Sequence, residues 1–350
     1  MTTEELRAQR LARQYLLEPA PAREVVRSLC GVQAQFLSNA LHALRIRCSD
    51  DSGAAAQQLV KNWTLRGTIH LFAPEDLPLF LPPGGPADYR SQDWSRPSFW
   101  NQRPDWVLTP QRQAFFSALI VGALQDGPLS RDALKVLCRA QGMTEAEEAN
   151  LFHAWGGGIG ELCTRGFLNQ VASEQKLFCL CPAFEPIPRE DAMLELARRY
   201  FTHYGPASIH DAMYFFRATA AQVRSWLAQL PVTAVDCDGR TYYNLGDCAA
   251  GTIPHCRFLA GFDPLMLGYE KKESPFLDPS RLRAVFSLAG IVSPTVLLDG
   301  RVCGTWKKTR KKLQIRLFPG VTSRSRDDIR EAAAALWPEG ISVTFSELDS

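Results

Sequence analysis

The stretch REDAMLELARRYFTHYGPASIHDAMYFFRATAAQVRSWLAQL, residues 189–230, decides the fold of this chain. Apolar residues recur at helical spacing on both sides of Gly205-Pro206, which predicts a helix, a turn and two further helices. Ser208 is a suitable N-cap for the helix after the turn. The segment VTAVDCDGRTYYNL follows, and its Asp238-Gly239 pair predicts a tight β-hairpin. This order of elements is typical of a winged helix-turn-helix unit.

The same order occurs twice earlier in the chain. Residues 109–142 predict two helices around Gly127-Pro128, with Ser130 as N-cap, and residues 167–181 predict a hairpin. At the start, Thr2 and Glu5 form a capping-box pattern, and two more helices are expected before the strand or hairpin of NWTLRGTIHLF, residues 62–72. The third of these helices is expected to begin at the sequence QAQ, residues 33–35. We therefore predict three tandem winged-helix units.

The pattern changes near residue 256. Short apolar runs are separated by Gly, Pro and Asp, Asp299-Gly300 indicates a tight turn, and a single helix over residues 325–337 interrupts the strands. These features predict a small β-barrel or curled sheet. The expected fold class is α+β and mainly helical, with four parts: winged helix 1 and a following loop (1–105), winged helix 2 (106–187), winged helix 3 (188–252) and a β-barrel (253–350).

Composition narrows the class of protein. Hydrophobic residues make up 46% and charged residues 22%, the balance of a soluble globular protein. The net charge of +2 neither requires nor excludes a polyanionic partner, because a basic groove can coexist with an acidic face. The ten cysteines include no CxxC pair, and the start MTTEELRAQR has no apolar signal region. We expect a cytoplasmic protein with reduced thiols and no membrane helix.

Metal and nucleotide chemistry have little support. The six histidines form no HExxH or HxH pattern, so we expect no metal and no cofactor. The glycine run WGGGIG, residues 155–160, lacks the Gly-Lys-Ser/Thr ending of a phosphate loop, and we interpret it as a helix-to-helix turn. No GxSxG or Cys-His signature of a covalent hydrolase is present.

A run of cations is the strongest charge cluster in the sequence. It comprises Lys307, Lys308, Arg310, Lys311 and Lys312, at a point where one strand is expected to turn into the next. A solvated hairpin tip and an edge that follows DNA phosphates are both consistent with it. The three winged-helix units favour the second interpretation.

Two glutamines, Gln33 and Gln35, lie where the third helix of a winged helix would meet a duplex. Residues two apart point to different sides of a helix, so their amides converge only if the segment is extended or just entering the helix. Gly31 permits such an entry. The pair could be solvent-facing or capping residues, readers of an adenine edge, or two amides that hold a water at a sugar carbon.

The motifs GVQAQ, WTLRGTIHLF, GFDPLMLGY and VLLDGRVCGTW, in this order, resemble the AlkZ/YcaQ-like winged-helix DNA glycosylase family. The resemblance covers nearly the whole chain and implies tandem winged helices packed with a β-barrel. It implies excision of alkylated purines from DNA, including bulky N7-guanine adducts and some interstrand crosslinks. The family's catalytic motif is Gln-x-Gln or Gln-x-Asp, so Gln33 and Gln35, with Ala34 between them, match the catalytic positions.

The resemblance gives the two amides a chemical role. Alkylation at N7 or N3 makes the purine cationic and a good leaving group, so the enzyme has only to place a water under the anomeric carbon and stabilise a cationic sugar. We expect a monofunctional hydrolase that acts on cationic N7- or N3-alkylated purines in duplex DNA. Flipping of the lesion is expected to be incomplete, since a bulky adduct does not fit a snug pocket.

Supporting residues follow from the same motifs. Arg66 and His70 match the family's Arg-Gly-Thr-x-His segment, and either line the cleft on DNA or fix the wing. Asp263 is expected to be a structural turn or a buried hydrogen-bond hub, and Arg224 a phosphate contact. The hairpin that probes the duplex is either the turn at Asp299-Gly300 or the Lys/Arg-rich turn after Trp306.

The alternative is a non-catalytic winged-helix transcriptional regulator. Such regulators are usually short chains that dimerise to read palindromes, and three unlike units in one chain suit that task poorly. We therefore expect a monomeric enzyme whose partner is duplex DNA.

Overall fold

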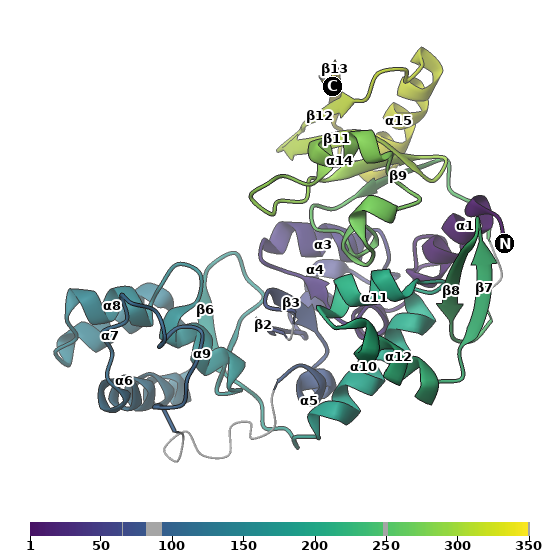
Figure 1. Ribbon diagram of the computed structural model, residues 1–350. Helices are drawn as coiled ribbons and strands as arrows, with labels where there is room; N and C mark the ends of the chain where they lie inside the picture. The colour runs from purple at the N-terminus through teal and green to yellow at the C-terminus, as the bar shows by residue number, and fades with distance from the viewer. Residues whose placement is uncertain (65, 82–92, 248–250, 349–350) are drawn as a thin grey trace. The chain divides into compact units, whose positions relative to one another are not determined.

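The computed structural model describes residues 1–64, 66–81, 93–247 and 251–348. The chain forms two compact units, drawn by residue number in Figure 1. The split unit comprises Met1–Ala55 with Leu196–Ser350, and the continuous unit comprises Ala56–Glu195. Leu65 of the hairpin motif, part of the loop assigned to the first winged helix, and Cys248 lie outside the described residues.

Three helices begin the split unit in the predicted order: α1 (Thr3–Arg13), α2 (Ala22–Ser28) and α3 (Leu37–Arg45). The short helix α4 (Ser52–Ala56), whose last residue belongs to the continuous unit, was not predicted. The capping box at the start of α1 is confirmed, because the Thr2 side chain accepts from the Glu5 N–H while the Glu5 carboxylate accepts from the Thr2 N–H. Two left-handed residues, Cys30 and Gly31, end the second helical segment.

The elements expected around Gly205-Pro206 are all present. They are α10 (Arg189–His203), α11 (Ile209–Phe216), α12 (Ala220–Gln229), β7 (Thr233–Cys237) and β8 (Arg240–Asn244). Ser208 caps α11 by accepting from the Asp211 N–H. Asp238 and Gly239 both have positive φ, 53° and 75°, as a two-residue hairpin turn requires.

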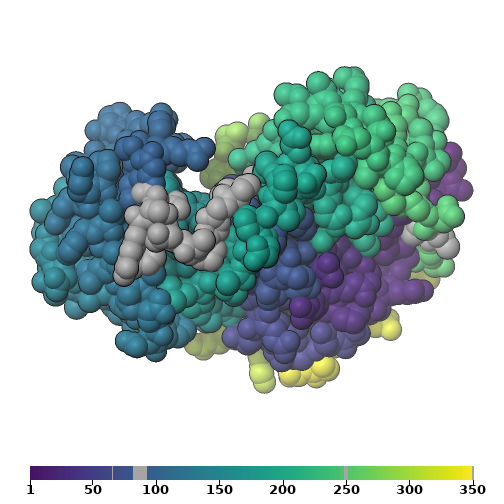
Figure 2. All heavy atoms as spheres, turned by 90° about the horizontal axis from the view of Figure 1, so that it is seen from below, coloured from purple at the N-terminus to yellow at the C-terminus, as the bar shows by residue number. Residues whose placement is uncertain are grey.

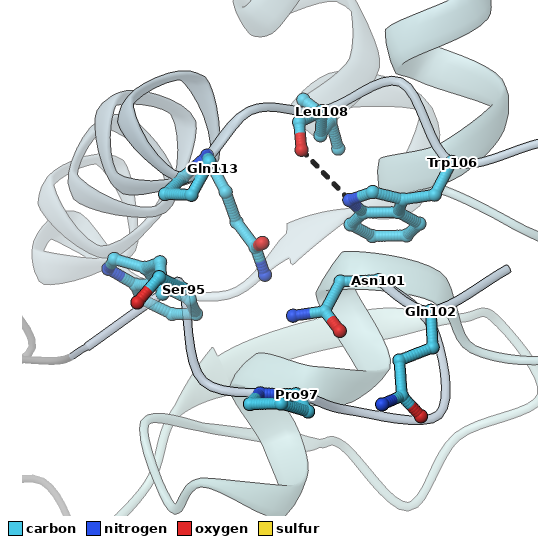
Figure 3. A pocket seen from close by; sticks show the side chains of 9 residues that line it. Ser95, Pro97, Asn101, Gln102, Trp106, Leu108 and Gln113 are labelled. Atoms are coloured by element: carbon cyan, nitrogen blue, oxygen red, sulfur yellow. Dashed lines mark hydrogen bonds between the residues drawn. The ribbon is translucent and has the colours of Figure 1, made fainter.

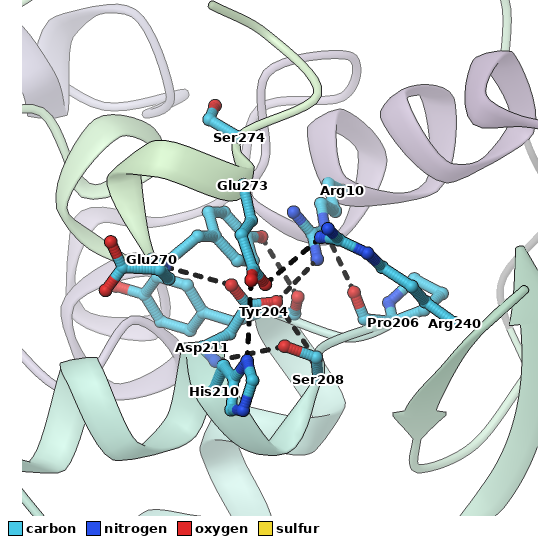
Figure 4. A network of polar contacts seen from close by, with 12 residues as sticks. Arg10, Tyr204, Pro206, Ser208, His210, Asp211, Arg240, Glu270, Glu273 and Ser274 are labelled. Atoms are coloured by element: carbon cyan, nitrogen blue, oxygen red, sulfur yellow. Dashed lines mark hydrogen bonds and ion pairs between the residues drawn. The ribbon is translucent and has the colours of Figure 1, made fainter. Parts of the chain in front are cut away.

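A buried ion pair connects the first helix to these later elements. The Arg10 guanidinium lies 2.9 Å from Asp211 Oδ2, and Arg10 Nε donates to the Pro206 carbonyl at 2.9 Å (Figure 4). The same guanidinium lies 3.7 Å from the centre of the Tyr269 ring. Asp211 Oδ1 accepts from the Glu270 N–H at 2.9 Å, so both oxygens of the Asp211 carboxylate have hydrogen-bond partners. Figures 1 and 2 show the purple N-terminal segment beside the green helices and strands of this region.

The C-terminal part of the split unit is a five-stranded sheet with order β13-β12-β11-β10-β9. The strands are β9 (Cys256–Leu259), β10 (Thr295–Leu298), β11 (Arg301–Thr309), β12 (Lys312–Leu317) and β13 (Ser342–Glu347). Short helical turns join β9 to β10: α13 (Pro264–Leu267), η4 (Lys271–Glu273), η5 (Pro279–Arg281) and α14 (Leu282–Val285). All neighbours are antiparallel except β12 and β13, which are parallel.

The prediction of a β-barrel is wrong, because the sheet does not close. β9 and β13 are its two edges, and β13 is reached from β12 through the crossover helix α15 (Ser323–Leu336). Ile329 and Ala333 of this helix share one apolar core with Phe258, Leu313 and Ile315 of the sheet. The helix therefore covers a face of the sheet, and the result is a helix layer on an open sheet.

The continuous unit combines a small sheet with helices. Its helices are α5 (Leu77–Phe80), α6 (Pro110–Ala123), α7 (Arg131–Ala140), α8 (Glu145–Leu151) and α9 (Gly157–Thr164), with 3-10 turns η1 (Pro74–Asp76) and η3 (Leu124–Asp126). Its strands are β2 (Val60–Trp63), β3 (Ile69–Phe72), β4 (Leu129–Ser130), β5 (Leu168–Gln170) and β6 (Leu177–Leu180), adjacent in the order β3-β2-β5-β6-β4. Both predicted hairpins and the Ser130 N-cap are confirmed.

The glycine run WGGGIG is the helix-to-helix turn that was expected. Trp155 and Gly156 lie between α8 and α9, residues 157–160 form the first turn of α9, and Gly156 and Gly157 have φ of 144° and 66°. A Cβ atom on Gly157 would lie 2.2 Å from the Asn150 carbonyl oxygen, so only glycine fits. The run therefore serves close packing of two helices and does not cradle a phosphate.

Candidate active site

Gln33 and Gln35 lie in the non-helical segment that precedes α3. Strand β1 (Val32–Gln33) ends at the first glutamine, Gln35 lies in a bend, and the helix begins only at Leu37. The expectation that the helix begins at the glutamines is therefore wrong by about one turn. Its physical reason is that Phe36, the N-cap, has extended backbone angles, φ −115° and ψ 110°.

The two glutamines differ in exposure. Ala34 between them is completely buried. Gln33 is half-buried and Gln35 is exposed. Within the described part of the chain, neither side-chain amide forms a hydrogen bond, so both are available to a water or a ligand.

A buried ion pair anchors the helix that follows the glutamines. Arg47, just after α3, places Nη2 2.6 Å from Asp263 Oδ1 and Nη1 3.0 Å from Asp263 Oδ2. Asp263 also accepts from the N–H groups of Ala260 and Leu265. The expectation that Asp263 is a structural turn or a buried hydrogen-bond hub is confirmed. Its partner Arg47 was not anticipated, since nothing in the sequence links two residues so far apart.

His42 provides a second attachment of α3. Its Nε2 lies 2.8 Å from the Phe258 carbonyl oxygen on β9, and its ring packs against Trp306 and Trp337. Burial lowers the pKa of His42 to about 4, so the ring is neutral at pH 7 and Nε2 donates to the carbonyl. Trp306 packs against both His42 and Trp337, and its Nε1 donates to the Leu259 carbonyl at 2.9 Å.

The Arg-Gly-Thr-x-His motif lies in the β2–β3 hairpin of the continuous unit. His70 is fully buried, with Nδ1 3.0 Å from the Thr68 carbonyl and 3.1 Å from the Thr64 hydroxyl. Burial lowers its pKa to about 3. The interpretation of His70 as a DNA contact is not supported, because its ring has no exposed surface, whereas the interpretation that it fixes the hairpin agrees with these bonds. Arg66 is half-buried in the turn.

The cationic cluster forms the tip of the β11–β12 hairpin. Lys307 and Lys308 end β11, Arg310 and Lys311 form the turn with Arg310 at φ 52°, and Lys312 begins β12. All five side chains are exposed, and none forms an ion pair with any residue that the structure describes. The alternating Leu313 and Ile315 of β12 are buried, so the hairpin is rooted in the core while its tip projects its charge into solvent.

The other candidate hairpin carries a different charge. At the β10–β11 turn, Asp299 Oδ1 lies 2.7 Å from His255 Nδ1, and His255 Nε2 lies 3.0 Å from Asp328 Oδ2. Hydrogen bonds that the His255 ring donates to the carboxylates of Asp328 and Asp299 raise the pKa of His255. This turn is therefore carboxylate-rich, unlike the β11–β12 tip. Arg224, the remaining predicted DNA contact, is exposed on α12.

A hollow of about 310 Å³ lies within the continuous unit (Figure 3). Its lining is formed by indole, amide and small side chains: Trp94, Ser95, Pro97, Asn101, Gln102, Trp106, Leu108, Pro110 and Gln113. The Gln113 amide points into it, and Gln113 Nε2 also donates to Glu161 at 2.8 Å. The lining residues include no carboxylate, imidazole, amine or thiol, and the one hydroxyl, that of Ser95, has no histidine or carboxylate beside it in the lining to activate it.

The structure gives no indication of a metal centre or a membrane segment. Among the described residues, no three His, Cys, Asp or Glu side chains are grouped to hold a metal ion. In that same part of the chain, no helix has both the length and the apolar character to cross a bilayer. The described cysteines are free thiols.

Comparison with known proteins decides the family. The family model for DNA glycosylase AlkZ-like proteins matches residues 26–337 of this chain. The chain belongs to the AlkZ-like DNA glycosylase family. It is 31% identical over 340 residues to the interstrand DNA cross-link repair glycosylase of Streptomyces sahachiroi, with 89% of each chain covered. The solved structure of the Streptomyces sahachiroi DNA glycosylase AlkZ matches with a TM-score of 0.77 and 26% identity, over 99% of this chain and 100% of that one.

Membership of the AlkZ-like family makes this protein an enzyme that cleaves N-glycosyl bonds in DNA. The alternative of a non-catalytic regulator is thereby rejected. The sequence reasoning did not anticipate Phe36 and Phe262, which lie beside the glutamines with their rings stacked. The signal for them was present, since Phe36 directly follows Gln35 and Phe262 directly precedes Asp263.

Proposed function

We propose that this AlkZ-like glycosylase hydrolyses the N-glycosidic bond of cationic N7- or N3-alkylated purines in duplex DNA, and that Gln33 and Gln35 are its catalytic residues. One observation carries the proposal. Two amides without hydrogen-bond partners among the described residues lie two positions apart in the non-helical segment before α3, which the buried Ala34 and the anchored helix α3 hold in place. Rigid support of this kind is what a positioning mechanism needs.

The chemistry requires no strong base. Positive charge on the purine weakens the bond to the sugar, and the bond electrons return to the purine as it leaves neutral. The amide oxygens accept hydrogens of a water and orient its oxygen toward the anomeric carbon, while their dipoles stabilise the cationic sugar. The water oxygen bonds to that carbon and its proton passes to solvent, which leaves an abasic site. A neutral base lacks the initial charge, so it is a poor substrate.

Bulky adducts and crosslinks belong to the proposed substrate range. The Streptomyces relative is an interstrand DNA cross-link repair glycosylase. Gln35 is exposed rather than enclosed, so an adduct too large for a snug pocket can still approach it. The lesion need not be fully extruded from the duplex for a water held here to reach its sugar.

The DNA contacts are proposed from charge and exposure. The β11–β12 tip, with Lys307, Lys308, Arg310 and Lys311, is the hairpin that approaches the duplex, because its exposed cations attract phosphates. The β10–β11 turn is a poor candidate, because Asp299 places a carboxylate there. Arg224 is proposed as a further phosphate contact, and Arg66 as one in the β2–β3 hairpin.

The helical groups are proposed to be three winged helices. Each has helices followed by a hairpin: α1–α3 with β2–β3, α6–α9 with β5–β6, and α10–α12 with β7–β8. The boundaries 1–105, 106–187, 188–252 and 253–350 follow from that grouping. Three unlike units in one chain suit an enzyme that works on DNA as a monomer.

The test is base release from alkylated duplex under single-turnover conditions. Free N7-methylguanine is quantified by mass spectrometry for wild type, for Gln33→Ala and Gln35→Ala, for the double variant, and for Gln141→Ala, an exposed glutamine on the continuous unit. Each single substitution should slow release roughly tenfold to a thousandfold, the range for one positioning group. Gln141→Ala should match wild type. A double variant as fast as wild type, or a covalent adduct trapped by borohydride, would refute the mechanism.

A further inference from the structure

Phe36 presents an aromatic ring to solvent directly after Gln35. The side chain is 50% exposed, and no other described phenylalanine or tryptophan of the split unit is as exposed. Ala34, two residues earlier, is completely buried. Phe36 instead lies half outside the core. An exposed aromatic ring is a common device for binding a nucleobase, since every base has a flat face to stack on.

A second ring supports Phe36 from one side. The ring of Phe262 is stacked beneath it, with centroids 5.8 Å apart and planes inclined by 25°. Phe262 is buried, whereas half of the Phe36 side chain stays exposed, so the Phe36 ring keeps a surface open to a stacking partner. The pair forms a platform whose open face lies next to the catalytic segment.

The backbone under this platform is in an uncommon conformation. Phe262 has φ 57°, in the left-handed region that aromatic residues seldom adopt. Its N–H donates to the Val292 carbonyl at 3.2 Å, and the next residue, Asp263, is held by the ion pair with Arg47. Strained backbone persists where the surrounding structure enforces it, and such positions cluster at functional sites.

We propose that the open face of Phe36 stacks on the cationic alkylated purine and selects it over an unmodified base. This inference rests on the proposed function of Gln33 and Gln35. The face of a phenyl ring carries negative electrostatic potential, so it attracts a positively charged planar ring more than a neutral one. When the bond to the sugar breaks, the positive charge moves from the purine to the sugar. The contact therefore stabilises the bound substrate more than the transition state, and Phe36 is a binding residue.

The first experiment compares Phe36→Leu with Phe115→Leu. Leucine keeps the apolar volume but lacks the aromatic face, and Phe115 is an exposed phenylalanine of similar exposure, 46%, on α6. Binding is measured by fluorescence anisotropy on a duplex with one non-hydrolysable 2′-fluoro 7-methylguanosine and on the unmodified duplex. Phe36→Leu should weaken binding to the lesion duplex roughly threefold to thirtyfold, the range for a cation–π contact, and change unmodified binding less than twofold. Phe115→Leu should change neither.

The second experiment separates charge attraction from shape. Phenylalanine analogues with one, two and three ring fluorines at position 36 progressively withdraw charge from the face at nearly constant size. The preference for the lesion duplex should fall stepwise along the series, while the saturated single-turnover rate changes much less. An unchanged preference in both Phe36→Leu and the fluorinated series overturns the inference.

The two proposals fail in different ways. If wild type releases the purine and the Gln33/Gln35 double variant does not, the function stands whatever the Phe36 variants do. If wild type releases no alkylated purine at all, the proposed function itself is wrong.

Discussion

Arg47 and Asp263 form a two-pronged ion pair in which both side chains are completely shielded from solvent. Removal of one partner leaves the other charge buried and uncompensated, which typically costs about 3–5 kcal/mol. We therefore expect Asp263→Ala to lower the free energy of unfolding by that amount, as measured by urea denaturation. The matched control is Asp327→Ala, which breaks the exposed pair with Arg330 and should cost less than about 0.5 kcal/mol. Equal effects of the two substitutions would contradict the structural role of the buried pair.

The β11–β12 tip predicts a salt-dependent DNA affinity. Each cation that neutralises a phosphate contributes about 0.9 to the slope of log affinity against log salt. The double substitution Lys307→Gln and Lys308→Gln should therefore reduce that slope by roughly 2, whatever the DNA sequence. The charge-matched control is Lys135→Gln with Arg139→Gln, because both of these cations already pair with Glu148. A tip that is merely solvated would leave the slope equal in the two double variants.

The substitution Gln35→Asp should make the reaction pH-dependent. Amides do not ionise between pH 5 and 8, so the single-turnover rate of wild type on a cationic lesion should be nearly flat over that range. A carboxylate acts only when ionised, and the negative duplex raises its pKa above the ordinary value of about 3.9. The rate of the variant should therefore fall as pH decreases from 7 to 5. Parallel pH profiles for the two enzymes would argue that residue 35 is not close to the reacting sugar.

The pKa values of two histidines should be shifted in opposite directions from the ordinary value. Burial lowers the pKa of His70 to about 3, so its NMR ring signals should not move between pH 8 and 5. Hydrogen bonds to Asp328 and Asp299 raise the pKa of His255. Its NMR ring signals should therefore titrate with a midpoint above the ordinary value of about 6.5.

The titration of His70 also has a consequence for stability. Between about pH 6.5 and 3, His70 is protonated in the unfolded chain but stays neutral in the folded chain. The contribution of His70 to stability is therefore fully present above pH 6.5 and is lost as the pH falls toward 3. The free energy of unfolding changes through this group by at most about 1.4 kcal/mol per pH unit. His70→Gln should therefore show a weaker loss of stability between pH 7 and 5 than wild type. Identical slopes would mean that the ring is not buried.

Local signals predicted most of the helices and hairpins correctly. Caps such as Thr2 and Ser208, and turns such as Asp238-Gly239, act over a few residues, so the sequence contains all the information they need. The closed barrel was predicted wrongly for the opposite reason. Strand patterns around β9–β12 do not reveal which strands become edges, and the apolar face of α15 on the sheet becomes evident only in three dimensions.

The candidate site was predictable in part. The spacing of Gln33 and Gln35 indicated that their amides can converge only outside a regular helix, and the structure places both residues before the first residue of α3. Which residues hold it was not predictable, because Arg47 meets Asp263 across 216 positions of sequence. His70 matched a motif as well as Arg66 did, but its neighbours in the fold bury it completely.

The division of one unit between both ends of the chain has a consequence for biosynthesis. Arg10 leaves the ribosome long before Asp211 is translated, and until then its guanidinium has no carboxylate partner and the first helices have no complete core. The intervening continuous unit has all its residues by position 195. During translation the continuous unit can therefore pack first. The segment with Gln33 and Gln35 completes its contacts only after the last strands of the split unit have been synthesised. A polypeptide that ends before residue 263 lacks the carboxylate that pairs with Arg47, so the buried guanidinium has no counter-charge and the split unit cannot complete its packing.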